Sequence, residues 1–194
     1  MVLIFTVIEM DILVHKMVNR LANIIYMNAF VTKEDEEKIR YALVVIINEF
    51  FKLIILVLLF SLFGKVQYFL FSLAILFMIR TFSGGRHFGS SLQCLIISVI
   101  FFVLSCIVFV DYLTIIENIT YLFVFISLAL ITVYSPFPNP KRPIKNKKRR
   151  CRLKVISIFF SILIALMLFS INDDKLFCCG ATTMLLQSLQ LIHK

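Results

Sequence analysis

The sequence predicts an all-α integral membrane protein with four to six transmembrane or re-entrant helices and an N-terminal amphipathic interfacial helix. Two observations lead to this fold class. Hydrophobic residues make up 61% of the 194 positions, against roughly 45–50% in soluble domains, yet the net charge is +9. A chain both very apolar and basic is most simply a membrane protein whose charge lies in its loops. Nucleic-acid binding, the other source of a basic charge, is excluded if the basic residues flank membrane spans.

Residues 1–40 are predicted to form an amphipathic and charged cytoplasmic segment. The polar residues that interrupt the apolar run 3–27 fall on one arc of a helix, which indicates a helix lying in the membrane interface; they are Glu9, Lys16, Asn19, Arg20 and Asn23. A first span with polar breaks is the alternative. Thr32, followed by Asp35 and Glu36, resembles the start of the next helix, with an N-cap and acidic residues in its first turn.

Six apolar segments follow the charged stretch, and we assign the whole chain, residues 1–194, to one membrane domain. The first segment is long enough to span a bilayer at about 1.5 Å per residue. The second, fourth, fifth and sixth are at or below the usual length, so some are tilted, re-entrant or extended by flanking residues. The segments are residues 41–63, 66–79, 92–110, 119–134, 155–171 and 176–192.

The loops predict the orientation. Residues 141–154 hold nine of the 20 Lys and Arg residues, and the positive-inside rule places such a loop in the cytoplasm. If the six spans cross the membrane alternately, starting from this loop, 17 of the 20 Lys and Arg residues lie on the cytoplasmic side. Both termini are then cytoplasmic, and the charge needs no nucleic acid to explain it.

Two irregular places interrupt the apolar segments. All four prolines lie within residues 136–143, inside a basic Pro-rich cytoplasmic loop that we place at residues 135–154. Three of the five glycines, Gly84, Gly85 and Gly89, lie in residues 80–94. Irregular backbone near a membrane is tolerated where it is buried in protein or lines a wet cavity, so residues 80–94 are the candidate catalytic segment.

His87 and Cys94 are the reactive side chains of this segment. A thiol needs a base to become a good nucleophile at neutral pH, and an imidazole can supply one. On one continuous helix the two residues would lie about 10.5 Å apart along the axis, so the pair requires a helix break. Gly89, Ser90 and Ser91 predict that break and a new helix start. A packing cysteine beside an interfacial histidine is the alternative.

The other polar residues in the apolar segments are predicted to be structural. The chain has five cysteines, an odd count with spacings that match no zinc pattern, so we expect neither a metal site nor a disulfide framework. Cys178 and Cys179 are interpreted as packing residues. Glu49 and Lys52 lie on neighbouring turns of the first span, where an i,i+3 pair can neutralise itself.

The segment 80–94 resembles AgrB, the membrane protein of accessory gene regulator systems. The matching residues are Arg80, the Gly84–Gly85 pair, His87 and Cys94. The resemblance extends to the chain length, the amphipathic start and a basic loop, here Lys141-Arg142-Pro143-Ile144.

The resemblance implies a membrane cysteine endopeptidase. AgrB-type proteins remove the acidic C-terminal tail of a short propeptide, AgrD, and cyclise the remainder through an acyl-enzyme to a thiolactone or lactone signal. By position, Cys94 is the nucleophile, His87 the base, and Lys141 and Arg142 bind substrate. The resemblance further implies a homodimer in the bacterial plasma membrane, in contact with lipid, without a cofactor. A non-enzymatic transporter or exporter of a hydrophobic signal peptide is the alternative function.

Overall fold

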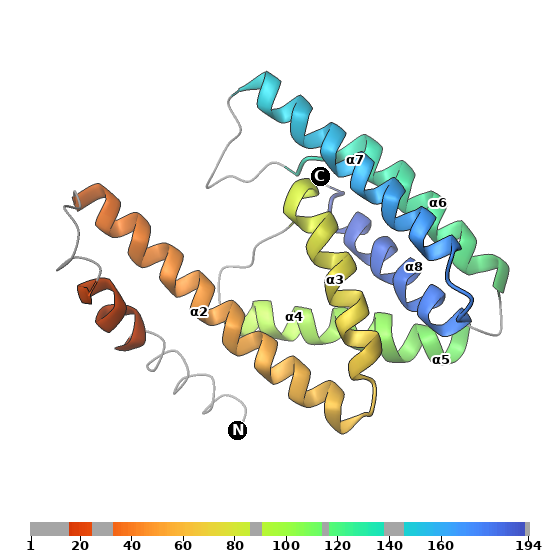
Figure 1. Cartoon of the computed structure of the whole chain (residues 1–194), viewed down its shortest axis with the longest axis horizontal. Coiled ribbons are helices and arrows are strands. Elements are labelled where there is room, and N and C mark those ends of the chain that lie inside the picture. The colour runs from red at the N-terminus through yellow and green to blue at the C-terminus, as the bar shows by residue number, and fades with distance from the viewer. Residues whose placement is uncertain (1–15, 25–32, 86–90, 114–116, 138–145, 193–194) are drawn as a thin grey trace.

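The computed structural model describes residues 16–24, 33–85, 91–113, 117–137 and 146–192. All regular elements of this part of the chain are helices, which confirms the all-α class. In chain order they are α2 (Lys33–Leu62), α3 (Val66–Ser83), α4 (Ser91–Val103), the π-helical turn η1 (Leu104–Val108), α5 (Phe109–Leu113), α6 (Glu117–Tyr134), α7 (Lys147–Phe169) and α8 (Asp174–Leu189). A short helix over residues 16–24 precedes them (Figure 1).

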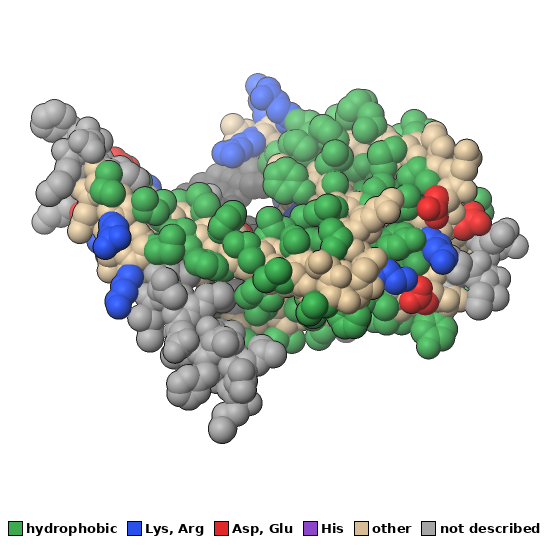
Figure 2. All heavy atoms as spheres, turned by 60° about the horizontal axis from the view of Figure 1, so that its bottom comes forward, with side chains coloured by type: hydrophobic (Ala, Val, Ile, Leu, Met, Phe, Trp, Pro, Cys, Tyr) green, Lys and Arg blue, Asp and Glu red, His purple; other side chains and the backbone are tan. Residues whose placement is uncertain are grey.

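Four helical stretches are long and apolar enough to cross a membrane, and a shorter apolar one accompanies them. The four are Asp35–Leu62, Val66–Ser83, Leu92–Tyr112 and Lys147–Phe169, and the shorter one is Ile119–Tyr134. This agrees with the predicted range of four to six. Several helices extend beyond their apolar runs, as α7 does by including basic residues from Lys147 onward. Figure 2 shows charged side chains gathered towards the ends of the molecule, with a broad hydrophobic surface between them.

Helix α8 lies at the centre of the fold. It packs against α3, α6, α7 and the η1–α5 stretch (Figure 1), and the side chains from Phe177 to Met184 are buried. Small residues allow this close packing: a Cβ atom at Gly180 would lie 2.3 Å from the Cδ2 atom of Leu168 on α7. With 16 residues, α8 is only about 24 Å long. It is therefore an interior helix, surrounded by its neighbours rather than by lipid.

A polar seam joins α8 to α3 and η1. Thr183 and Ser72 hydroxyls are 2.6 Å apart, and Ser72 is also 3.4 Å from the hydroxyl of Ser105 in the π-helical turn. Two buried, free cysteines continue the seam, with the Cys179 thiol donating to the Cys106 sulfur over 3.8 Å. Side-chain hydrogen bonds of this kind hold helices together inside membrane proteins. The interpretation of Cys179 as a packing residue is confirmed.

Turns that are distant in sequence meet at the two ends of the bundle. At one end the Nζ atom of Lys65, in the α2–α3 turn, lies 2.9 Å from an oxygen of Asp111 on α5. At the other end the backbone N–H of Phe137 donates to the carbonyl of Ser83 over 2.8 Å, which joins the residues after α6 to the end of α3. The α2–α3 turn therefore lies beside α5, and the end of α3 lies beside the residues after α6.

The helix over residues 16–24 lies against α2. Val18 is buried with Ile47 of α2, and Arg40 donates a hydrogen bond of 2.9 Å to the side chain of Asn19. Lys16 and Arg20 are exposed. This part of the predicted amphipathic helix is amphipathic in the structure, whereas residues 1–15 and the predicted helix start at Thr32 lie outside the described residues.

Candidate functional site

The candidate segment begins where α3 ends. Gly84 follows the last helical residue with φ 79° and ψ −166°, and its backbone N–H donates to the carbonyl of Arg80 over 2.9 Å. This combination of angles is essentially restricted to glycine. The first glycine of the pair is therefore required by the sharp departure of the chain from α3.

Two other parts of the fold hold this turn in place. The side-chain amide of Gln187 on α8 donates a hydrogen bond of 2.9 Å to the carbonyl of Gly84. Phe137 packs over the same residue, since a Cβ atom at Gly84 would lie 3.3 Å from the Cβ atom of Phe137. The direction in which the chain leaves α3 is thus set by α8 and by the segment after α6. Sequence reasoning missed Gln187, because its partner lies 103 positions away.

The second glycine makes room for Arg80. Gly85 is buried, and a Cβ atom there would lie 3.1 Å from the Nε atom of Arg80. A Cβ atom at position 85 would require the arginine side chain to shift by a few tenths of an ångström. Arg80, Gly84 and Gly85, which the sequence groups as one motif, therefore form one unit in space.

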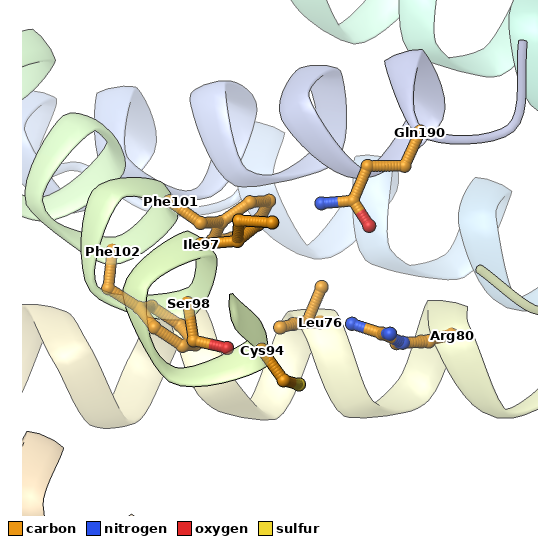
Figure 3. Close-up of a pocket in the computed structure, with 8 residues that line it drawn as sticks. All are labelled: Leu76, Arg80, Cys94, Ile97, Ser98, Phe101, Phe102 and Gln190. Carbon is orange, nitrogen blue, oxygen red and sulfur yellow. The ribbon is translucent and has the colours of Figure 1, made fainter. Parts of the chain in front are cut away.

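Arg80 and Cys94 face the same small pocket (Figure 3). The guanidinium group points into it from α3, the thiol from α4, and the amide of Gln190 from the end of α8. Its volume is about 20 Å³, which is room for about one water molecule. The lining residues are Leu76, Arg80, Cys94, Ile97, Ser98, Phe101, Phe102 and Gln190. The thiol of Cys94 therefore lies in a mostly apolar pocket, facing the guanidinium of Arg80 and the amide of Gln190.

Cys94 is the fourth described residue of α4 (Ser91–Val103), and the predicted break at Gly89 and Ser90 lies outside the described residues. Its side chain is half-buried, and its sulfur lies 3.6 Å from the Nζ atom of Lys52 on α2. Lys52 also forms an ion pair with Glu49, one turn earlier in α2. The predicted i,i+3 pair is thus present, but its lysine additionally contacts the candidate nucleophile. A charged residue inside a membrane span was the available signal for this contact.

Several predicted site residues lie outside the described part of the chain. They are His87, Gly89, Lys141 and Arg142. The described end of the basic loop starts α7, where the Asn146 side chain accepts hydrogen bonds from the backbone N–H groups of Lys148 and Arg149. The side chains from Asn146 to Arg152 are exposed. This places a cluster of exposed positive charge at the beginning of α7.

Comparisons with known proteins point to one family. The sequence profile of accessory gene regulator B matches residues 18–191. A putative AgrB-like protein from Clostridium beijerinckii is 32% identical over 165 residues, which cover 85% of this chain and 81% of that protein. The accessory gene regulator protein B of Staphylococcus saprophyticus is 32% identical over 139 residues, 70% of this chain and 71% of that one. No solved structure matches the chain significantly.

Proposed function

Because the chain belongs to the accessory gene regulator B (AgrB) family, we propose that it is a membrane cysteine endopeptidase. It removes the C-terminal tail of a short AgrD-like propeptide and cyclises the remainder to a thiolactone or lactone signal. Membership of the family connects the chain to the agr quorum-sensing system. The protease and cyclisation steps are the proposal.

The position of Cys94 carries this proposal. Its sulfur lies at a half-buried surface, beside the cation of Lys52 and in a pocket that Arg80 also lines. Apolar residues such as Ile97 and Phe101 form much of the wall. An apolar wall that excludes bulk water favours transfer of an acyl group to a second thiol over hydrolysis. A merely structural cysteine would not need charged groups on two sides.

In the proposed mechanism, His87 accepts the proton of the Cys94 thiol, and the sulfur attacks the peptide carbonyl. The C–N bond then breaks, and the tail leaves as an amine that receives the proton from His87. A Cys thiol or Ser hydroxyl of the propeptide next attacks the thioester, which closes the ring and releases Cys94. Exchange of an acyl group between thiols is nearly isoenergetic, so closure of a thiolactone needs no nucleotide. The guanidinium of Arg80 can donate to substrate carbonyl or carboxylate oxygens.

The partners follow from charge and from the family. An acidic propeptide tail would be attracted to Lys141, Arg142 and the exposed bases at the start of α7, in a salt-dependent way. We propose that the protein is a homodimer in the bacterial plasma membrane with both termini in the cytoplasm, where a newly made propeptide is available.

The test is co-expression with the propeptide and mass spectrometry of the products. We expect the Cys94→Ala variant to leave the propeptide intact. The Cys151→Ala variant, which removes an exposed cysteine of α7, should process it normally. Unchanged cleavage by Cys94→Ala would contradict the protease assignment. If Cys94→Ala left cleavage unchanged but reduced export of the peptide, the protein would be better described as a transporter.

A further inference from the structure

The only charged residues of the 41–62 stretch of α2 are Glu49 and Lys52. A cation in a membrane span is costly unless it is paired, and such residues commonly serve function. The side chain of Lys52 is 17% exposed and that of its partner Glu49 is 55% exposed. The lysine is therefore the inward-facing member of the pair.

Lys52 faces the sulfur of Cys94. Its Nζ atom lies 3.6 Å from Sγ, in a contact between residues 42 positions apart that links α2 to α4. An ammonium group has donors and no acceptor, so the sulfur must accept in this contact. The geometry thus suits a sulfur that carries negative charge, as a cysteine nucleophile does while it attacks or leaves.

We propose, on the basis of the proposed protease function, that Lys52 is a catalytic residue that stabilises the negative charge of the Cys94 sulfur. It acts both when the thiol loses its proton to attack the peptide and when the sulfur leaves the thioester during ring closure. No additional bond or reactant is needed, because Lys52 keeps its own proton throughout. Glu49 is a positioning residue that holds the ammonium group toward the sulfur.

The charged and titratable groups that face Cys94 come from several elements. Lys52, with Glu49 behind it, comes from α2, and Arg80 comes from α3 across the pocket. Gln190 at the end of α8 is neutral, and His87 precedes α4 in sequence. The Nζ atom of Lys52 is in direct contact with the sulfur. Its removal is therefore expected to weaken the nucleophile.

The test measures the rate at which iodoacetamide modifies Cys94 in the purified full-length protein, by mass spectrometry across a range of pH. We expect Lys52→Met to slow modification at neutral pH by roughly tenfold or more. The difference should close at high pH, where the thiol ionises without help. Lys52→Arg should retain most of the rate. Exposed Cys151, in the same molecule, should react equally in every variant and serves as the internal reference.

Lys65→Met is the matched control, because Lys65 is also a partly buried lysine in an ion pair but lies at the other end of the bundle. Equal rates and pH profiles for wild type and Lys52→Met would overturn the proposal. If Lys52→Met does not fold, Lys52→Gln provides the same comparison. The alkylation assay needs no propeptide. The effect of Lys52 on Cys94 can therefore be measured even if Cys94→Ala fails to block processing, so that the role of Lys52 and the proposed protease function can each fail separately.

Discussion

Replacing Gln187 by Leu is expected to disturb the placement of the candidate segment while leaving the stability of the fold nearly unchanged. Gln187 is fully buried, and its amide donates to the carbonyl of Gly84 over 2.9 Å. Leu fills a similar volume and cannot donate. The variant therefore releases the turn after α3 from α8 without opening a large cavity.

The expected change in the free energy of unfolding is small because two contributions oppose each other. The Gly84 carbonyl still accepts from the Ser83 hydroxyl at 3.2 Å, so the loss is that of one net hydrogen bond, about 0.5–1.5 kcal/mol. The Oε1 atom of Gln187 has no hydrogen-bond partner among the described residues. Removing this buried oxygen regains about 1–3 kcal/mol. We therefore expect the variant to lie between about 0.5 kcal/mol less stable and about 2.5 kcal/mol more stable than wild type.

We expect Gln187→Leu to change the rate of propeptide cleavage more clearly than it changes the stability of the fold. Loss of about 1 kcal/mol of anchoring lowers the equilibrium constant between the anchored and the released turn about fivefold. The propeptide cleavage rate in proteoliposomes should fall by up to that factor, while thermal unfolding in detergent changes little. Gln67→Leu, an exposed substitution at the start of α3, is the control. Full cleavage activity in a stably folded Gln187→Leu variant would refute the reasoning that α8 positions this segment.

Three further substitutions test the packing. Gly84→Ala places a side chain at φ 79° and ψ −166°, so it should lose about 1–3 kcal/mol of stability and cleave the propeptide more slowly; an unchanged melting temperature would argue against that backbone conformation. Gly180→Leu should reduce stability by about 1–3 kcal/mol, because even its Cβ atom would lie 2.3 Å from Leu168; a wild-type yield of monodisperse protein on size exclusion would speak against the close packing of α8. Lys65→Gln removes a partly exposed ion pair with Asp111 and should cost less than about 1 kcal/mol; a much larger drop in melting temperature would show that this pair contributes more than exposed pairs usually do.

Much of the fold can be predicted from the sequence because membrane spans are local properties. A run of apolar residues long enough to cross a bilayer identifies a span by itself, and the basic residues beside it orient it. The end of α3 is equally local, because the glycine-rich stretch that the sequence marks as irregular includes Gly84, which ends that helix. Cys94 could be selected for the same reason, since its type and its spacing from His87 are visible in the sequence.

The centre of the fold could not be predicted in this way. Residues 176–192 are another apolar run by composition, yet α8 lies inside the bundle. Whether a helix faces lipid or protein depends on which small residues, such as Gly180, meet a neighbouring side chain. That depends on packing between distant segments, which periodicity along one helix does not report.

The sequence by itself therefore determined the class of protein, the approximate spans, the break after α3 and the candidate nucleophile. Only the tertiary structure decided what surrounds that nucleophile. From the sequence alone, Lys52 is interpreted as one half of a self-neutralising pair with Glu49. Its contact with Cys94 joins residues that lie 42 positions apart. Gln187 holds the Gly84 turn from a distance of 103 positions. Charge, length and glycine content act along the chain, whereas the groups around a reactive atom are selected by how the helices pack.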